Sequence, residues 1–214
     1  MNSVNYQKQL DEIISHNVQN GIVPTLLLHS CCAPCSSYVL EYLSQYFKIT
    51  VLYYNPNISP FVEYEKRKHE LNRLISAMPF KNAVNKIDCD YDSDAFFRVV
   101  KGLEGCPEGG ERCFRCYELR LRAAAQKAKQ LGTDYFASTL SISPLKNAAK
   151  LNEIGEGLAR EYGVSWLPND FKKREGYKRS VELSRQYSLY RQDYCGCVFS
   201  KKKEELSESE CEAN

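Results

Sequence analysis

Short apolar runs alternate along the chain with segments of helical periodicity. The short runs predict buried strands at residues 24–29, 49–54, 83–89, 134–138 and 164–167. Apolar residues that recur every three or four positions predict helices at residues 4–19, from Ser36 onward, and at residues 61–76, 93–102, 112–131 and 146–162. Alternating strands and helices form right-handed crossovers and a parallel sheet covered on both faces. We therefore predict a three-layer α/β fold with a parallel, Rossmann-like sheet.

A single domain accounts for residues 1–200. A length of 214 residues suits one hydrophobic core, and 43% hydrophobic and 26% charged residues are ordinary for a globular protein. We see no internal repeat and no sign of a second domain. Residues 201–214 are dominated by charged residues and serine, so we expect a disordered tail there.

The charge pattern indicates a local basic surface in a cytoplasmic protein. No apolar run approaches the roughly 20 residues that a membrane span needs, and residues 1–20 lack the pattern of an export signal. The net charge is only +2, so overall basicity gives no argument for a nucleic-acid partner. Basic residues crowd one late segment, however: Lys172, Lys173, Arg174, Lys178, Arg179, Arg185 and Arg191.

Ten cysteines require an explanation, because a reducing compartment makes a disulfide framework unlikely to form. Seven of them fall into three groups: Cys31-Cys32-x-x-Cys35, Cys113-x-x-Cys116 and Cys195-Gly-Cys197. The first group follows the carboxyl end of a predicted strand, where open α/β sheets bind ligands. The first two groups also lie at predicted helix starts, where exposed N–H groups stabilise thiolates. The three groups predict metal or redox chemistry.

The non-catalytic alternative for these groups is a structural zinc site. Two thiolates one helical turn apart can bind an ion or a cluster, or form a disulfide. A Cys₄ zinc site explains four of the grouped thiols and leaves three over. We expect Cys89 to be a core residue, Cys106 to lie near the second group without binding metal, and Cys211 to have no role. His29 we expect to be packed and hydrogen-bonded beside the first group.

Several motifs, in order along the chain, resemble a known family. They lie at residues 29–35, 54–58, 63–67, 112–120, 139–147, 170–177 and 190–200. They include the segments HSCCAPC, YNPNI, RCFRCY and YRQDYCGCVFS. Together they resemble the QueH-type epoxyqueuosine reductases, which are iron–sulfur enzymes independent of cobalamin. The resemblance covers about residues 23–200.

This resemblance implies a nucleotide-hydrolase-like α/β fold with a [4Fe–4S] cluster. The implied reaction is the two-electron deoxygenation of epoxyqueuosine to queuosine at the wobble position of tRNAs with GUN anticodons, the last step of queuosine biosynthesis. Since the family is unrelated in sequence to the cobalamin-dependent enzyme with the same reaction, we expect no corrinoid. The electron donor stays unidentified.

The resemblance also implies roles for the cysteines. The implied cluster ligands are Cys31, Cys32, Cys113 and Cys116. Cys195 and Cys197 would form a redox-active dithiol or, together with Cys35, bind an additional mononuclear iron. A neighbouring acid must protonate the epoxide oxygen. The candidates, chosen because they lie in or beside family motifs, are Asp170, Asp193 and Tyr194.

The late basic segment is the predicted tRNA-binding surface. Single-stranded loops are recognised through phosphate contacts and base stacking, which interleaved basic and aromatic residues provide. The predicted residues are Lys172, Lys173, Arg174, Tyr177, Lys178, Arg179 and Arg191. The alternative is that this basic segment is a solvated helix face that binds no ligand. Four further cations would either contact phosphates or balance thiolate charge: Arg112, Arg115, Arg120 and Lys146.

Two other functions compete with the reductase. An ATP-dependent tRNA-thiolating enzyme on a similar fold would need a glycine-rich pyrophosphate loop after the first strand. Residues 30–35 contain no glycine and include Pro34, which disfavours nucleotide binding. A zinc-stabilised RNA-binding module would explain the basic segment and one set of four cysteines, but it gives no reason for Cys195 and Cys197.

Overall fold

Residues 4–200, which the computed structural model describes, form alternating strands and helices. The strands are β1 (Thr25–His29), β2 (Lys48–Tyr53), β3 (Val84–Asp88), β4 (Tyr135–Ser138) and β5 (Ser165–Trp166). The α-helices are α1 (Tyr6–Gln19), α2 (Ala33–Leu43), α3 (Phe61–Ala77), α4 (Ser93–Val100), α5 (Glu111–Leu131), α6 (Ala148–Tyr162) and α7 (Gly176–Gln186). Two 3₁₀ turns are η1 (Thr139–Ile142) and η2 (Val198–Ser200). The expected tail and Cys211 lie outside the described residues.

The five strands form one parallel sheet in the order β3-β2-β1-β4-β5. Leu27 in β1 lies between Thr50 of β2 and Phe136 of β4. This order matches the first five strands of a Rossmann-type sheet, so the predicted α/β parallel fold is confirmed. The order along the chain reverses between β1 and β4. Ligands of such sheets bind at this switch point, beyond the carboxyl ends of the strands.

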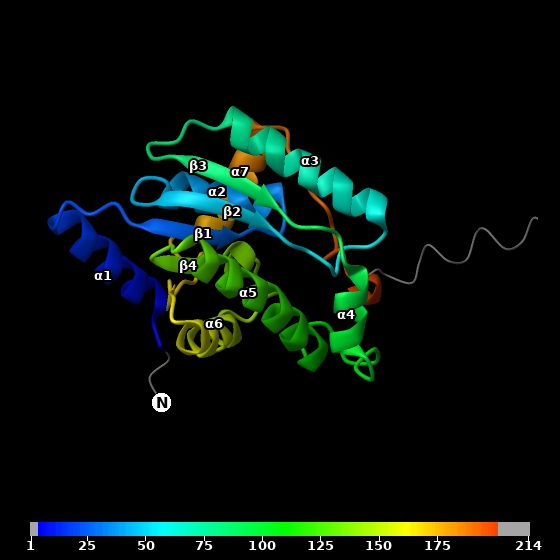
Figure 1. The fold of residues 1–214 in the computed structure, drawn as a ribbon. Coiled ribbons are helices and arrows are strands. Elements are labelled where there is room, and N and C mark those ends of the chain that lie inside the picture. Colours follow the sequence, from blue (N-terminus) through cyan, green and yellow to red (C-terminus); the bar gives the residue numbers. More distant parts are fainter. Residues whose placement is uncertain (1–3, 201–214) are drawn as a thin grey trace, which may run out of the picture.

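Helices cover both faces of the sheet (Figure 1). Leu26 and Leu28 of β1 pack on the side of α2 and α3, whereas Leu27 packs on the side of α5 and α6. Successive strand residues point to opposite faces, and both faces are buried here, which is why the strand sequence is continuously apolar. Helix α1 lies at the amino ends of the strands (Figure 1). Within residues 4–200, no helix has both the length and the apolar surface needed to cross a bilayer.

Helix α7 was not predicted from the sequence. Its buried residues are mostly small, at a spacing of four: Gly176, Ser180 and Ser184. A Cβ atom at Gly176 would lie 2.1 Å from the carbonyl oxygen of Phe171 and 2.4 Å from the ring of Tyr38 in α2. The helix therefore packs against α2 through a small, polar face, and an analysis of apolar periodicity does not detect such a face.

Candidate metal centre

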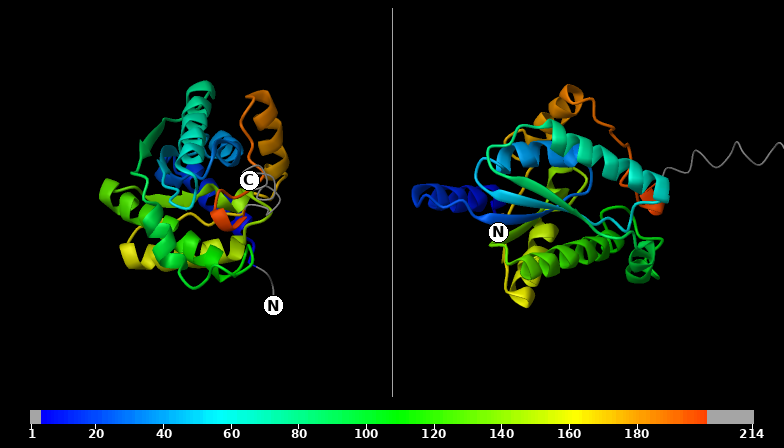
Figure 2. Two further views of the ribbon diagram at one scale, coloured as in Figure 1. Left: turned by 90° about the vertical axis from the view of Figure 1, so that its right-hand side faces the viewer. Right: turned by 45° about the horizontal axis from the view of Figure 1, so that its top comes forward.

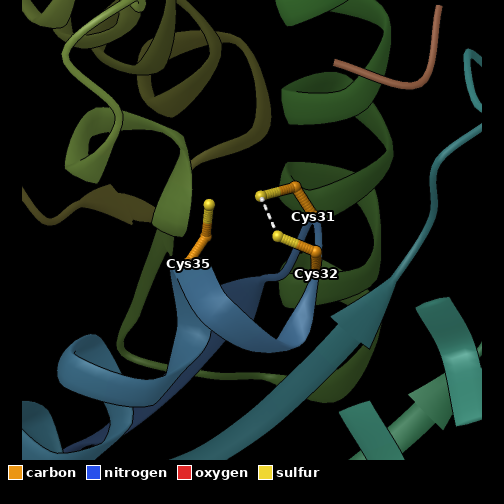
Figure 3. A group of neighbouring side chains, drawn as sticks. All are labelled: Cys31, Cys32 and Cys35. Atoms are coloured by element: carbon orange, nitrogen blue, oxygen red, sulfur yellow. Dashed lines mark hydrogen bonds between the residues drawn. The ribbon is translucent and has the colours of Figure 1, made fainter. Parts of the chain in front are cut away.

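The first cysteine group lies at the switch point of the sheet. Cys31 follows β1, Cys32 caps α2, and Cys35 lies in the first turn of that helix. The Sγ atoms of Cys31 and Cys32 are 3.7 Å apart, and the three sulfur atoms all lie within 4.8 Å of one another (Figure 3). Thiolates this close can share one metal ion, so this trio has the geometry of a metal site.

Hydrogen bonds lower the pKa of Cys31 and favour its thiolate form within the trio. The thiols of Cys32 and Cys35 donate to Cys31, and these bonds, despite burial, hold the pKa of Cys31 well below its usual range. The pKa of Cys32 is raised to about 12, mainly because its thiol donates to Cys31. Thr139, which follows β4, contacts Cys31 through its Oγ1, at 3.4 Å from the backbone nitrogen and 3.6 Å from the Sγ. Loops from both sides of the switch point thus hold one thiolate.

The second cysteine group lies in the first two turns of α5. The backbone N–H of Gly109, in the loop before the helix, donates to the Sγ of Cys113 at 3.3 Å. Cys116 is buried and shares an apolar cluster with Cys197, Phe96 and Val100. Burial raises the pKa of Cys116 to about 12. The predicted placement of both C-x-x-C segments at helix starts is therefore confirmed.

The third group returns to the same edge from the end of the described chain (Figure 2). Gly196 has a φ of +98°, and its carbonyl accepts a hydrogen bond from the N–H of Ser59 at 2.9 Å. The carbonyl of Cys195 accepts from Arg67 Nη1 at 3.1 Å. The Sγ of Cys195 accepts from Lys146 Nζ at 3.2 Å. Three segments far apart in sequence therefore bring thiols to one end of the sheet.

Four buried cations surround these thiols: Arg67, Arg112, Arg120 and Lys146. None of them is more than 8% exposed. Only two have carboxylate partners in residues 4–200: Arg67 pairs with Glu63 at 2.6 Å, and Lys146 with Glu108 at 3.3 Å. Buried charges need compensation, which the Cys31 thiolate and an anionic occupant of the site would supply. Of the two roles expected for Arg112, Arg120 and Lys146, the burial favours charge balance over phosphate contact.

Arg115 differs from these buried cations. Its side chain is 53% exposed and pairs with Glu111 at 3.1 Å. It therefore remains accessible to an external anion.

The donor set fits a thiolate-bound metal cofactor. Cys31, Cys32 and Cys35 converge as the ligands of a bound metal do. The buried cations fit an anionic occupant. The buried hydroxyl of Tyr117, in the turn after Cys113, has no hydrogen-bond partner among residues 4–200 and adds a polar group. A neutral, purely apolar filling would leave this charge uncompensated.

The three expected proton donors differ in how closely their contacts connect them to the thiols. Tyr194 precedes Cys195, and its ring lies 5.1 Å from the Cζ atom of Arg67, the residue that binds the Cys195 carbonyl. Asp193 is exposed. Asp170 pairs with Lys172 at 2.9 Å, and Lys172 also donates to the carbonyl of Ser141 in η1. Among residues 4–200, the side-chain partner of Asp170 is thus Lys172 and not a cysteine.

The expected tRNA-binding residues lie on and before α7. Arg174 pairs with Asp11 at 2.5 Å, and Arg179 pairs with Glu41 at 2.6 Å. The remaining members are exposed or half-buried: Lys172, Lys173, Tyr177, Lys178 and Arg191. The Cζ atom of Arg191 lies 6.0 Å from the centre of the Tyr177 ring. These partners tie α7 to α1 and α2, and the exposed ion pairs are weak enough for a phosphate to displace them.

Several site residues received no role from the sequence. Asn55 follows β2, and Thr139 follows β4. Both stand at carboxyl ends of strands, as Cys31 does, so their position was a usable signal. Tyr117 and Glu63 lie on helices, and nothing in their spacing distinguishes them from packing residues. Cys89 is half-buried against the core, as expected.

Fold and site together define a class of protein. A parallel α/β sheet carries clustered thiols at its switch point, where nucleotide-binding relatives of this architecture carry a glycine-rich loop. This arrangement is that of a thiolate- or metal-dependent redox enzyme.

Comparison with known proteins identifies the family. The family described as "Epoxyqueuosine reductase QueH" matches residues 26–203. The chain belongs to this family, which confirms the resemblance seen in the sequence and the oxidoreductase function it implied. Proteins of that name from Streptococcus pyogenes serotype M1 and Staphylococcus epidermidis are each 44% identical, over 93% and 94% of this chain and 79% and 86% of their own. The Thermotoga maritima protein is 34% identical over 82% of this chain and 90% of its own.

Among solved structures, an NAD⁺ synthetase from Burkholderia pseudomallei matches 87% of this chain and 90% of its own. Its TM-score of 0.29 and identity of 7% are too low to carry an argument. The fold class rests instead on the strand order.

Proposed function

We propose that this chain reduces epoxyqueuosine to queuosine at the wobble position of tRNAs with GUN anticodons, using a [4Fe–4S] cluster bound by Cys31, Cys32, Cys113 and Cys116. The reaction takes two electrons and two protons, breaks both C–O bonds of the epoxide, and yields an alkene and water. A low-potential cluster supplies electrons one at a time. The electrons come from a cytoplasmic donor that we leave unidentified.

The observation that carries this proposal is the gathering of seven thiols and four buried cations at one edge of the sheet. Three segments contribute the thiols, and all three belong to one sheet and its connections. We therefore propose that the α/β unit expected over residues 1–200 is a single catalytic domain. The cations compensate the negative charge that four thiolates and a cluster bring.

The remaining thiols lie beside the proposed cluster ligands. Cys35 is within 4.8 Å of Cys31 and Cys32. Cys195 is bonded to Lys146, whereas Cys197 packs with Phe96. The two thiols thus have different neighbours, and their proposed roles are those of a redox-active dithiol or of ligands, with Cys35, to an additional iron. The ratio of iron to sulfide distinguishes these roles.

Protonation of the epoxide oxygen is assigned to Tyr194 first and Asp170 second. Tyr194 is the nearer of the two to the thiols along the chain, and its hydroxyl lies 3.4 Å from the carbonyl of Ser59. A Tyr194→Phe variant should retain iron but lose at least about tenfold in turnover. An unchanged turnover would move the assignment to Asp170.

The first experiment measures iron, zinc and acid-labile sulfide in protein purified and reconstituted without oxygen. We expect about four irons and four sulfides per chain, with an absorption band near ~400–420 nm that dithionite bleaches. A fifth iron without sulfide would support the additional iron site. Zinc without sulfide would instead support the zinc-stabilised RNA-binding module.

Serine variants of the proposed ligands test the assignment of residues. Cys113→Ser and Cys116→Ser should lose the bleachable band, because a hydroxyl is a poor ligand for cluster iron. Cys89→Ala is the matched control, since Cys89 is half-buried in the core and outside the three groups. Full iron and sulfide in Cys113→Ser would remove that residue from the ligand set.

The basic segment before and on α7 is proposed to bind the anticodon loop. Lys173 and Lys178 are exposed, and within the described part of the chain only Lys178 of the two forms an ion pair, with Glu175 at 3.4 Å. Replacing both lysines with alanine should weaken tRNA binding and reduce its salt dependence by about one to two ions. Lys48→Ala, at the exposed start of β2 and outside the basic segment, is the control. Equal salt slopes for all three proteins would place the tRNA elsewhere.

A further inference from the structure

Arg120 is a fully buried cation with only neutral partners. It lies one turn after Cys116 in α5, with 2% of the residue exposed. No carboxylate pairs with it among residues 4–200. A buried guanidinium without an acidic partner is costly, so its retention needs a compensating contact.

The guanidinium connects α5 to the loops after β1 and β2. Its Nη2 donates to the Oδ1 of Asn55 at 2.5 Å. The Nδ2 of Asn55 donates in turn to the carbonyl of Ser30 at 2.9 Å, directly before Cys31. Arg120 Nε lies 3.4 Å from the Nε2 of His29, the last residue of β1. Arg120 and Asn55 therefore link the helix that carries one cysteine pair to the loop that carries the other.

His29 is a further neutral neighbour of the Arg120 guanidinium. Its Nδ1 lies 2.9 Å from the Ser138 hydroxyl, and its Nε2 lies 3.0 Å from the carbonyl of Tyr54. Ser138 Oγ also accepts from the N–H of Leu140. The neutral ring adds no charge in either tautomer. Compensation for Arg120 has to come from the thiol side.

That side holds two cysteine groups. Cys116 lies one turn before Arg120 in α5. Asn55, the hydrogen-bond partner of Arg120, holds the carbonyl of Ser30, directly before Cys31. Arg120 is thus the cation that faces both pairs of proposed cluster ligands.

We propose that Arg120 is a positioning residue with two separable effects on the metal centre. Its bond to Asn55 fixes the spacing between the Cys31/Cys32 loop and α5. Its charge favours the reduced, more negative state of the bound cluster and so raises the reduction potential of that cluster. This inference rests on the proposed function, because it needs a cluster at the site.

Three variants separate the two effects. Arg120→Met removes both the charge and the hydrogen bond to Asn55, which we call the bridge. Arg120→Lys keeps only the charge, and Asn55→Leu removes only the bridge. Arg122→Met, on the exposed side of the same helix and paired with Glu118 and Glu161, is the matched control. The measurements are the cluster midpoint potential, the rate of iron loss to a chelator, and the melting temperatures with and without cluster.

We expect a lower midpoint potential in Arg120→Met alone. Iron loss should be at least about tenfold faster in Arg120→Met, Arg120→Lys and Asn55→Leu than in Arg122→Met, because the two loops no longer hold their spacing. The rise in melting temperature on cluster binding should shrink in the same three variants, since ligand affinity adds directly to stability. A merely structural role would lower both melting temperatures equally and leave that rise unchanged.

The two failures are distinguishable. An Arg120→Met protein that binds the cluster, with the midpoint potential and the iron-loss rate of the wild type, would overturn this inference and leave the proposed function intact. Wild-type protein that binds no iron and sulfide after reconstitution would overturn both. If Arg120→Met does not fold, Arg120→Lys and Asn55→Leu decide, and wild-type iron loss in both would refute the bridge.

Discussion

Gly196 shows how much one residue contributes to the site. Its φ of +98° is open to glycine and strained for other residues. A Cβ atom there would lie 2.9 Å from Arg67 Nη1 and 3.0 Å from Ile58 Cγ1. The glycine therefore allows the backbone between Cys195 and Cys197 to pass close to Arg67.

Gly196→Ala should cost about 1–3 kcal/mol of stability through backbone strain and displace both neighbouring cysteines. We expect any iron that is not accompanied by sulfide to be lost, which metal analysis and thermal melting can follow. Gly105→Ala is the control, because an added Cβ there meets nothing within 4 Å. Equal iron content in the two variants would mean that Cys195 and Cys197 bind no metal.

At the scale of elements, α6 illustrates what the sequence could and could not reveal. Its apolar periodicity predicts a helix ending at Tyr162, and the observed end is the same. The periodicity does not show that Gly155 faces the ring of Trp166, since that contact joins α6 to β5. A Cβ atom at Gly155 would lie 2.3 Å from the nearest ring atom, whereas one at Gly157 meets nothing within 4 Å.

These two glycines form a natural pair for mutation. Gly155→Ala should destabilise the protein by about 3 kcal/mol, because the indole has to move and is held by Asn152 through a 2.9 Å hydrogen bond. Gly157→Ala should stabilise it by about 0.5–1 kcal/mol through helix propensity. Chemical denaturation measures both, and equal effects would contradict the packing of α6 on β5.

The sheet carries a pH-dependent clamp at its amino end. Asp134 Oδ2 accepts from the backbone nitrogen of Thr25 at 2.8 Å and from its hydroxyl at 2.7 Å. These bonds lower the pKa of Asp134. A lowered carboxyl pKa stabilises the fold above the ordinary Asp value of about 4 and stops doing so as the pH falls through the folded pKa.

Asp134→Asn should therefore cost about 1 kcal/mol at neutral pH and progressively less below about pH 4. Urea titrations of the metal-free protein at several pH values measure this difference. Thr25→Val removes one donor to the same carboxylate and should show a smaller loss with the same pH dependence. A pH-independent difference would show that the carboxylate charge contributes nothing.

The sequence was most informative where apolar periodicity or cysteine spacing reported directly on structure. Strands and helices before residue 170 follow from periodicity, and the family follows from ordered motifs. Helix α7 escaped because Gly176, Ser180 and Ser184 bury a small face instead of an apolar one. The sequence left phosphate contact and charge balance open for Arg120, because its burial depends on Asn55 and His29, which are distant in sequence.

At the scale of the whole molecule, the metal centre joins the sheet to a segment that contributes no strand to it, residues 187–200. The segment from Tyr187 to Ser200 contains no α-helix or strand. It is attached to α3 through Arg73, which donates to the carbonyl of Tyr187 at 2.9 Å, and through the bond from Arg67 to Cys195. Metal bound to Cys195 or Cys197 would tie this segment to the sheet.

Removing the metal should lower the melting temperature by roughly 10 °C, because binding to the folded state alone stabilises it and the buried cations lose their counter-charge. Differential scanning calorimetry before and after chelation measures the shift. Limited proteolysis should then cleave first between residues 187 and 200. An unchanged melting temperature and cleavage pattern would mean that the metal has no structural role.

The close trio of Cys31, Cys32 and Cys35 has a consequence for biosynthesis. The ribosome delivers these residues long before Cys113 or Cys195, so a growing chain offers three thiols without the rest of the site. Zinc binds such thiolates more tightly than ferrous iron does. Correct maturation therefore has to displace or outcompete zinc at an early-made fragment, and overproduced protein from iron-poor cultures should carry zinc until it is reconstituted.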